Sequence, residues 1–229
     1  MEAQLSVYCS EIAKANTEPI LGTAIHAPRF LLVETPTPWL PVIEEMPEFE
    51  NLYTNEQKLP EVRLQALMPN PAYSVDGFKR VIYFSLPEQP FSKYQKAEYL
   101  VPDELVPELS EALVNDPDYL NVFGEFEQKN DKRDILVCTH ASRDRCCGKF
   151  GYPIYEQIRD NYASSDLRVW RTSHMIGHRF SPTLIDFPEG RVWGNLRPED
   201  LENLINRTGE PIDLHSKYRG WAALDPIAQ

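Results

Sequence analysis

Short apolar runs, separated by polar and proline-containing segments, are the main pattern of this chain. Runs bounded in this way, and the alternation of apolar and polar residues over 62–68, are typical of strands, which we expect over residues 30–33, 62–68, 79–86, 134–138, 167–171, 183–187 and 191–194. Apolar residues recur at helical spacing elsewhere, so helices are expected over 103–114, from about 152, and over 198–208. The acidic stretch 40–60 is also expected to contain a helix, and residues 1–29 to be helical or irregular.

The order of these elements indicates two related halves. The second half is expected to run strand, helix, three strands and helix, which is the thioredoxin-like pattern. The first half has a similar order, and its segment 31–35 is similar to 136–139. The polar stretch 116–133 lies between them. We therefore predict an α/β, thioredoxin-like fold of two related half-domains with a mixed β-sheet, divided into residues 1–130 and 131–229.

Composition and charge restrict the classes of partner. The chain has 229 residues and is 42% hydrophobic, enough for a sizeable core. A net charge of −12 and a pI of about 4.9 disfavour nucleic-acid binding, which needs a basic surface, and suit either solubility or docking onto a basic protein. The first twenty residues show no secretory signal, and no apolar run is long enough to cross a bilayer. We expect a cytoplasmic protein with reduced cysteines and no nucleic-acid or membrane partner.

Two cysteines and two histidines are the candidate chemical groups. Cys138 and Cys147 follow the expected strand 134–138, and His174 and His178 follow the expected strand 167–171. Strand ends that bring thiolates and imidazoles to one point can bind a metal through four ligands. The residues alone leave three readings open: an iron–sulfur cluster, a structural Cys2His2 zinc site, and a metal-free thiol oxidoreductase or interaction module.

The remaining cysteines and histidines are expected to have structural roles. Cys146 and Cys147 are adjacent, so their side chains should diverge, and Cys147 is the expected ligand because Gly148 allows a tight turn and leaves room for a cluster. Cys146 is then expected to pack as a small apolar side chain. Cys9, His26 and His215 have no visible partner in the sequence.

These residues and several other segments resemble the sucrase/ferredoxin-like family, a branch of the thioredoxin-like ferredoxins. The resemblance covers nearly the whole chain, and the Cys/Cys/His/His spacing is its most specific part. The matching segments are Leu136–His140, Arg143–Asp144, Cys146–Gly148, Ser173–His174, Gly177–Phe180, Phe187–Gly190 and Trp193–Gly194 in the second half, and Cys9, Gly22–Ala24, Phe30–Glu34 and Pro38–Trp39 in the first.

The resemblance implies a [2Fe-2S] cluster held by Cys138, Cys147, His174 and His178 in the second half. It implies one-electron transfer, coupled to proton uptake because imidazole ligands ionise, and a redox protein partner that donates or accepts the electron. An electron-transfer protein is favoured over an enzyme, and the sucrase of the family name finds no support, since no paired carboxylates stand out. Many family members continue beyond the position of Gln229, so we expect a shortened chain.

Overall fold

The strands of this protein pair into one mixed nine-stranded sheet in the part of the chain that the structure describes. That part of the computed structural model comprises residues 8–49, 52, 62–225 and 227–229. The sheet has the order β4-β3-β1-β2-β6-β5-β7-β8-β9. Its strands are β1 (Arg29–Glu34), β2 (Val62–Leu67), β3 (Phe78–Ser85), β4 (Gln95–Pro102), β5 (Arg133–Cys138), β6 (Leu167–Thr172), β7 (Leu184–Phe187), β8 (Arg191–Trp193) and β9 (Tyr218–Trp221).

The two halves of the sheet have the same topology. In the first half, β1 pairs parallel with β2 and antiparallel with β3, which pairs antiparallel with β4. In the second half, β5 pairs parallel with β6 and antiparallel with β7, which pairs antiparallel with β8. The halves join where Leu67 of β2 pairs with Thr172 of β6. The predicted α/β fold of two related half-domains with a mixed sheet is confirmed, while the boundary at residue 130 stays a prediction.

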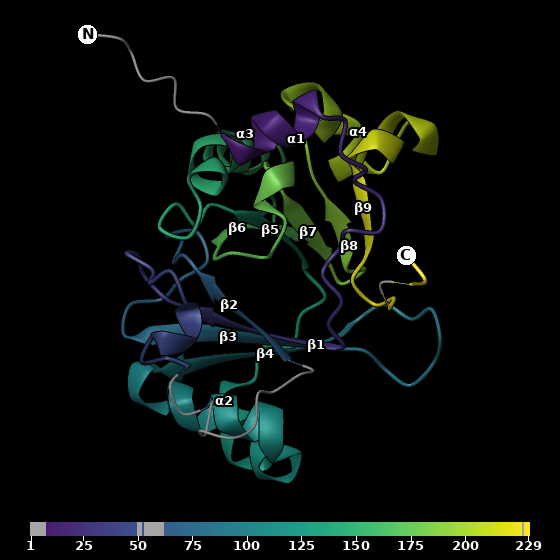
Figure 1. Cartoon of the computed structure of the whole chain (residues 1–229). Helices are drawn as coiled ribbons and strands as arrows, with labels where there is room; N and C mark the ends of the chain where they lie inside the picture. The colour runs from purple at the N-terminus through teal and green to yellow at the C-terminus, as the bar shows by residue number, and fades with distance from the viewer. Residues whose placement is uncertain (1–7, 50–51, 53–61, 226) are drawn as a thin grey trace, which may run out of the picture.

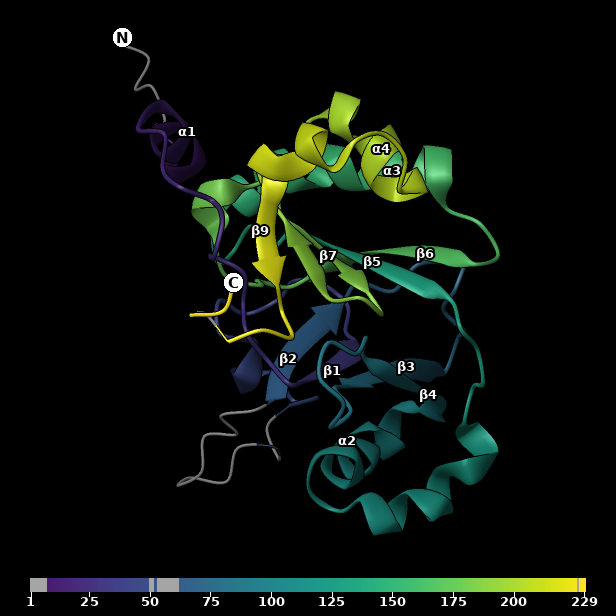
Figure 2. The same cartoon turned by 90° about the vertical axis from the view of Figure 1, so that its right-hand side faces the viewer.

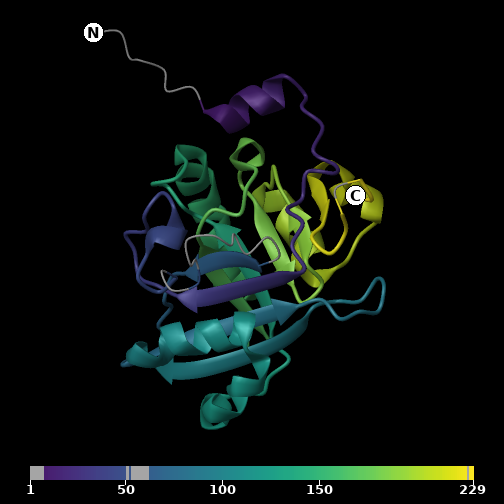
Figure 3. The same cartoon turned by 60° about the horizontal axis from the view of Figure 1, so that its bottom comes forward.

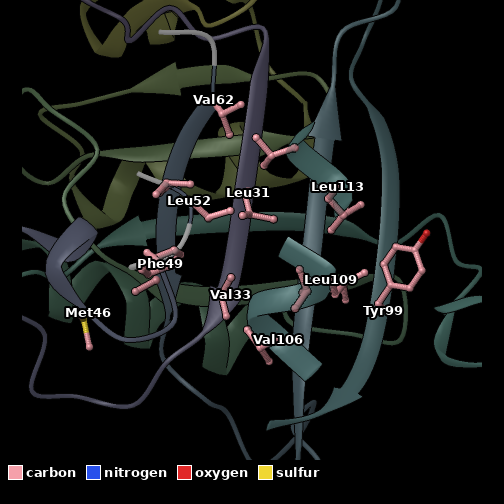
Figure 4. Packing of buried hydrophobic residues seen from close by; sticks show 14 of the residues in the cluster. Leu31, Val33, Met46, Phe49, Leu52, Val62, Tyr99, Val106, Leu109 and Leu113 are labelled. Atoms are coloured by element: carbon pink, nitrogen blue, oxygen red, sulfur yellow. The ribbon is translucent and has the colours of Figure 1, made fainter. Parts of the chain in front are cut away.

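Alternation along the strands sets the layers, because successive side chains point to opposite faces. In β1, Leu31 and Val33 join the core under α2 (Val106–Asn115), whereas Phe30 and Leu32 face the second half. Figure 4 shows the first of these cores, in which Leu109 and Leu113 of α2 belong to the same buried cluster as Leu31.

The second half has the same arrangement, with its helices on the opposite side of the molecule from α2 (Figure 1). Ile135 and Val137 of β5 pack under α3 (Tyr152–Tyr162) and α4 (Leu201–Asn206), whereas Leu136 and Cys138 face the first half. The two halves of the sheet therefore lie face to face, and the layers are helix, half-sheet, half-sheet and helix, as Figures 1 and 2 show. Between the half-sheets, the rings of Phe84 and Phe187 stack with centroids 4.1 Å apart.

A buried ion network also links the halves. Arg168 of β6 pairs with Glu98 of β4 at 2.6 Å and with Asp134 of β5 at 2.8 Å. Lys96 pairs with Asp134 at 2.7 Å, and Arg80 pairs with Glu98. Burial alone raises the pKa of Glu98, but the hydrogen bonds and charges of Arg168, Lys96 and Arg80 outweigh it and lower the pKa to about 2.

Most predicted elements are present, and two strands were missed. The structure has strands at every predicted position, and the helix expected over 103–114 is a short 3-10 turn followed by α2. The stretch 40–60 forms a 3-10 turn at Ile43–Glu45 where it is described, and residues 50–51 and 53–61 lie outside the described part. Residues 1–29 contribute α1 (Cys9–Ala15). The missed strands are β4 and β9. No described helix combines the length and the apolar character needed to cross a membrane.

Glu98→Gln is expected to lower the free energy of unfolding at neutral pH by about 3–5 kcal/mol, because buried cations lose their counter-charge. The pKa of Glu98 is about 2 in the folded protein, and its ordinary value is 4.5. Its contribution to the free energy of unfolding is therefore present above pH 4.5 and is lost as the pH falls towards 2. The variant should therefore show a flatter stability profile over this range in urea titrations.

Glu202→Gln, on the exposed side of α4, is the matched control and should change stability by less than about 0.5 kcal/mol. Equal losses for the two variants would contradict the role of the buried network.

Candidate metal centre

The parallel pairing of β5 and β6 brings the two candidate loops together. The register opposes Cys138, the last residue of β5, to Thr172, the last residue of β6. Parallel strands end at the same edge of a sheet, so the loops that follow both strands start side by side. One loop leads to Cys147 and the other to His174.

Three of the predicted ligands converge at this edge. The ligand atoms of Cys138, Cys147 and His174 lie within 4.8 Å of one another, and Cys147 Sγ is 3.7 Å from His174 Nδ1. Both cysteines are buried, with 1% and 0% of their surface exposed. The hydrogen bond from Cys147, helped by His174, holds the pKa of Cys138 well below its usual value, whereas the bond to Cys138 and burial raise the pKa of Cys147. The contact between the two sulfurs is the first cause of both pKa changes.

Cys147 is positioned by a wide helical turn. Residues Cys147–Gly151 form a π-helical segment that leads directly into α3. A Cβ at Gly148 would lie 2.5 Å from that of Ala141, and one at Gly151 would collide with the carbonyl oxygen of Cys138. Gly148 is therefore required by close packing, and the tight turn expected there from the sequence is absent.

The His174 loop is held by polar groups from both halves. Arg63 of β2 donates a hydrogen bond to the His174 carbonyl oxygen at 2.7 Å, and the His174 N–H donates to His140 Nδ1 at 3.1 Å. Burial lowers the pKa of His140, which fits the neutral tautomer that this bond requires. The ring of Trp39, from the first half, packs edge-on against His140 with centroids 5.5 Å apart.

His178 lies beside this group of three with a different partner. Its ring centroid is 5.6 Å from that of His174, but its Nδ1 is 3.2 Å from the Asp144 carboxylate. One ring nitrogen of His178, a carboxylate oxygen of Asp144 and the sulfur of Cys9 form a second group, and these three atoms lie within 4.8 Å of one another. The structure thus brings together three of the four predicted ligands and places the fourth at their side.

Arg219 supports the turn between the two histidines. This fully buried side chain donates to the carbonyl oxygens of Ile176 at 3.0 Å and of Thr23. Burial lowers its pKa to about 10, so it remains a cation at neutral pH. Gly177, with a φ of 85°, lies against the guanidinium, and a Cβ there would collide with it. Arg219 therefore places a positive charge near the two cysteines, which favours thiolates.

The other cysteines and histidines lie outside the group of three. Cys146 is buried and its Sγ faces Cys9 Sγ at 2.9 Å. His26 Nδ1 is 3.2 Å from the Ala222 carbonyl oxygen, and His215 is exposed. Sequence reasoning missed the Cys9–Cys146 contact because these residues are 137 positions apart. The contact of Asp144 with His178 was also missed, although a carboxylate so close in sequence to Cys146 and Cys147 is a signal that could have indicated it.

Comparison with known proteins places the chain in a family. The model of the family described as sucrase/ferredoxin-like matches residues 20–220. The chain belongs to this family. The match includes all four candidate ligands and most of both half-sheets.

Two relatives and one solved structure share only a small part of their sequence with this chain. A protein of Meyerozyma guilliermondii named altered inheritance of mitochondria protein 32 is 26% identical over 218 residues, covering 79% of this chain and 77% of its own. Its namesake in Debaryomyces hansenii is 29% identical over 92 residues, 37% of this chain and 34% of its own. A solved thioredoxin-like [2Fe-2S] ferredoxin from Aquifex aeolicus is 15% identical, with a TM-score of 0.32, and the match covers 37% of this chain and 88% of the ferredoxin.

Gly177→Ala is expected to destabilise the fold. The positive φ of this position strains a residue with a Cβ by roughly 1–2 kcal/mol, and the collision of that Cβ with Arg219 adds to this loss. The turn that carries both histidines should shift, so the variant should also bind less metal. Thermal melts and metal analysis measure the two effects.

Gly124→Ala is the control, because a Cβ at Gly124 meets nothing within 4 Å and its φ is not positive. The interpretation fails if Gly177→Ala melts and binds metal like Gly124→Ala.

Proposed function

We propose that this protein holds a [2Fe-2S] cluster through Cys138, Cys147, His174 and His178 and transfers single electrons. The observation that carries the proposal is the convergence of two buried thiols and one imidazole within 4.8 Å at the edge of the sheet. Membership of the sucrase/ferredoxin-like family supports it. When bound, the cluster supplies a site that takes up and releases one electron.

The donor set fits such a group. Thiolates are the usual ligands of iron–sulfur clusters, and two imidazoles can replace two thiolates on one iron. The contacts of Cys138 with Cys147 and His174 lower its pKa, which favours the thiolate form that iron binds. A bound metal ion deprotonates a coordinating thiol outright, so it would supply the charge that lets Cys147 ionise as well.

His178 is proposed as the fourth ligand, through the ring nitrogen that Asp144 does not contact. Asp144 bonds its Nδ1, so Nε2 is the nitrogen proposed to face iron. A carboxylate on the second nitrogen fixes the orientation of a ligating imidazole and raises its basicity. Asp144 is accordingly proposed to position His178 without binding the metal itself.

The ligand types predict a higher potential than that of four-cysteine clusters. The oxidised core carries two positive charges, and two thiolates with two neutral imidazoles leave the site neutral, whereas four thiolates make it doubly negative. A neutral site accepts an electron more easily. Neutral imidazole ligands also offer protons to be gained or lost, so we expect coupled proton uptake.

His174 offers a route for the electron to a partner. It lines a surface cavity of roughly 390 Å³ together with Arg143 and Ile176, the latter 49% exposed. A redox protein that docks over this cavity would approach one ligand closely. The partner is proposed to be a reductase or an electron acceptor, with no role for nucleic acid or membrane. The cytoplasmic location stays a prediction, and a relative is named for the inheritance of mitochondria.

A structural zinc site is the second candidate, because zinc also binds two cysteines and two histidines. Anaerobically purified protein should be red-brown and contain two irons and two inorganic sulfides per chain. A colourless protein with one zinc would establish the second candidate instead. A protein that folds fully without metal and is indifferent to His174 and His178 would support a thiol oxidoreductase or interaction module.

Cys147→Ser is expected to abolish the cluster or destabilise it strongly, because it removes a buried ligand. Cys146→Ser is the matched control and should keep its colour, since Cys146 Sγ faces Cys9. Iron and sulfide analysis of the two variants measures this, and the reverse pattern would show that Cys146 is the ligand.

The midpoint potential of the wild-type protein is expected within the range of clusters with two histidine ligands, about −150 to +300 mV. His174→Cys and His178→Cys should each keep a cluster and lower this potential, since a thiolate adds negative charge. Protein-film voltammetry measures it. Potentials near about −400 mV in the wild type, or unchanged in both variants, would point to other ligands.

A further inference from the structure

Two more cysteine sulfurs meet beside the metal centre. Cys9 Sγ and Cys146 Sγ are 2.9 Å apart, and both residues are free cysteines. Cys9 is the first residue of α1 and is half-buried, whereas Cys146 precedes the ligand Cys147 and is 2% exposed. Non-bonded sulfur atoms rarely approach so closely, so this contact needs an explanation of its own.

Both sides of the contact are held in place by other interactions. The Cys146 N–H donates to the Asp144 carboxylate at 2.8 Å, and Ser181 Oγ donates to the Cys146 carbonyl oxygen at 2.9 Å. Helix α1 packs against the 3-10 turn His178–Phe180, although the strands that follow α1 in sequence belong to the other half. Figure 3 shows α1, in purple, beyond the green strands of the second half.

We propose that Cys9 and Cys146 form a reversible disulfide, a redox modification site separate from the metal centre. A small disulfide of the glutathione type is the oxidant. The half-buried Cys9 sulfur attacks it and releases one thiol, and the Cys146 sulfur then displaces the second thiol from Cys9. The protein loses two hydrogen atoms and the oxidant becomes two thiols, so atoms and electrons balance.

The geometry suits a disulfide with little movement. The sulfurs must close from 2.9 Å to about 2.05 Å, which the first turn of α1 can absorb. The product would tie α1 to the loop that carries Cys147 and Asp144. Oxidation would thereby restrain one ligand and the partner of another, while the sulfurs of Cys138 and Cys147 remain in the metal centre.

The test uses the full chain, as isolated and after metal removal, in anaerobic glutathione buffers of increasing oxidised fraction. Acid quenching, thiol alkylation and trypsin digestion then separate the cysteines, because Cys9 lies in peptide 1–14, Cys138 in 134–143, and Cys146 with Cys147 in 146–149. A linked peptide joining 1–14 to 146–149 is expected in both preparations, and reductant should reverse it.

Variants assign the linkage to one sulfur. Cys9→Ser and Cys146→Ser should lose the linked peptide completely, and Cys147→Ser should keep it. Circular dichroism checks that each variant is folded. The linked peptide of the wild-type protein tests the disulfide without any substitution. Absence of the linked peptide at every glutathione ratio, or an equal yield in Cys146→Ser, would overturn the proposal. Because the metal-free protein is also tested, this outcome is separable from failure of the cluster assignment.

Discussion

The parallel pairing of β5 with β6 is the constraint on which the candidate centre depends. It sets Cys138 opposite Thr172, so the chain leaves both strands at one edge and His174 arrives beside Cys138. The close approach of Gly148 and Gly151 to this edge then brings Cys147 into the same group. A shift of one residue in the register of β5 would turn Cys138 to the opposite face, under α3 and α4.

The two halves share a topology but divide the work. Cys138 is the last of six residues in β5, and the equivalent last residue of β1 is Glu34. Glu34 is buried and accepts hydrogen bonds from Ser74 Oγ at 2.6 Å and from the Arg80 N–H at 2.9 Å. The first half therefore holds a structural carboxylate where the second half holds a candidate ligand. The first half instead supports the centre from the side: Trp39 packs against His140, and Arg63 donates a hydrogen bond to the His174 carbonyl oxygen.

The sequence predicts the strands in which apolar residues run together or were seen to alternate with polar ones, and it misses β4 and β9. Strand β4 was not predicted because it contains Lys96 and Glu98. The burial of these charged residues depends on Arg168, which lies in a distant strand. The loops that carry Cys138, Cys147 and His174 were predicted to meet because each follows such a run. The pairing of His178 with Asp144 and the meeting of Cys9 with Cys146 depend on how α1 and the loops pack, which no local pattern contains.

Two imidazole nitrogens bound to one cluster are the central feature of the proposed centre. Electron–nuclear double resonance on the reduced protein, with its histidines isotopically labelled at nitrogen, measures this directly. We predict two strongly coupled histidine nitrogens, one of which disappears in each of His174→Cys and His178→Cys. A reduced cluster without strongly coupled histidine nitrogens, or with couplings that survive both substitutions, would contradict the assignment.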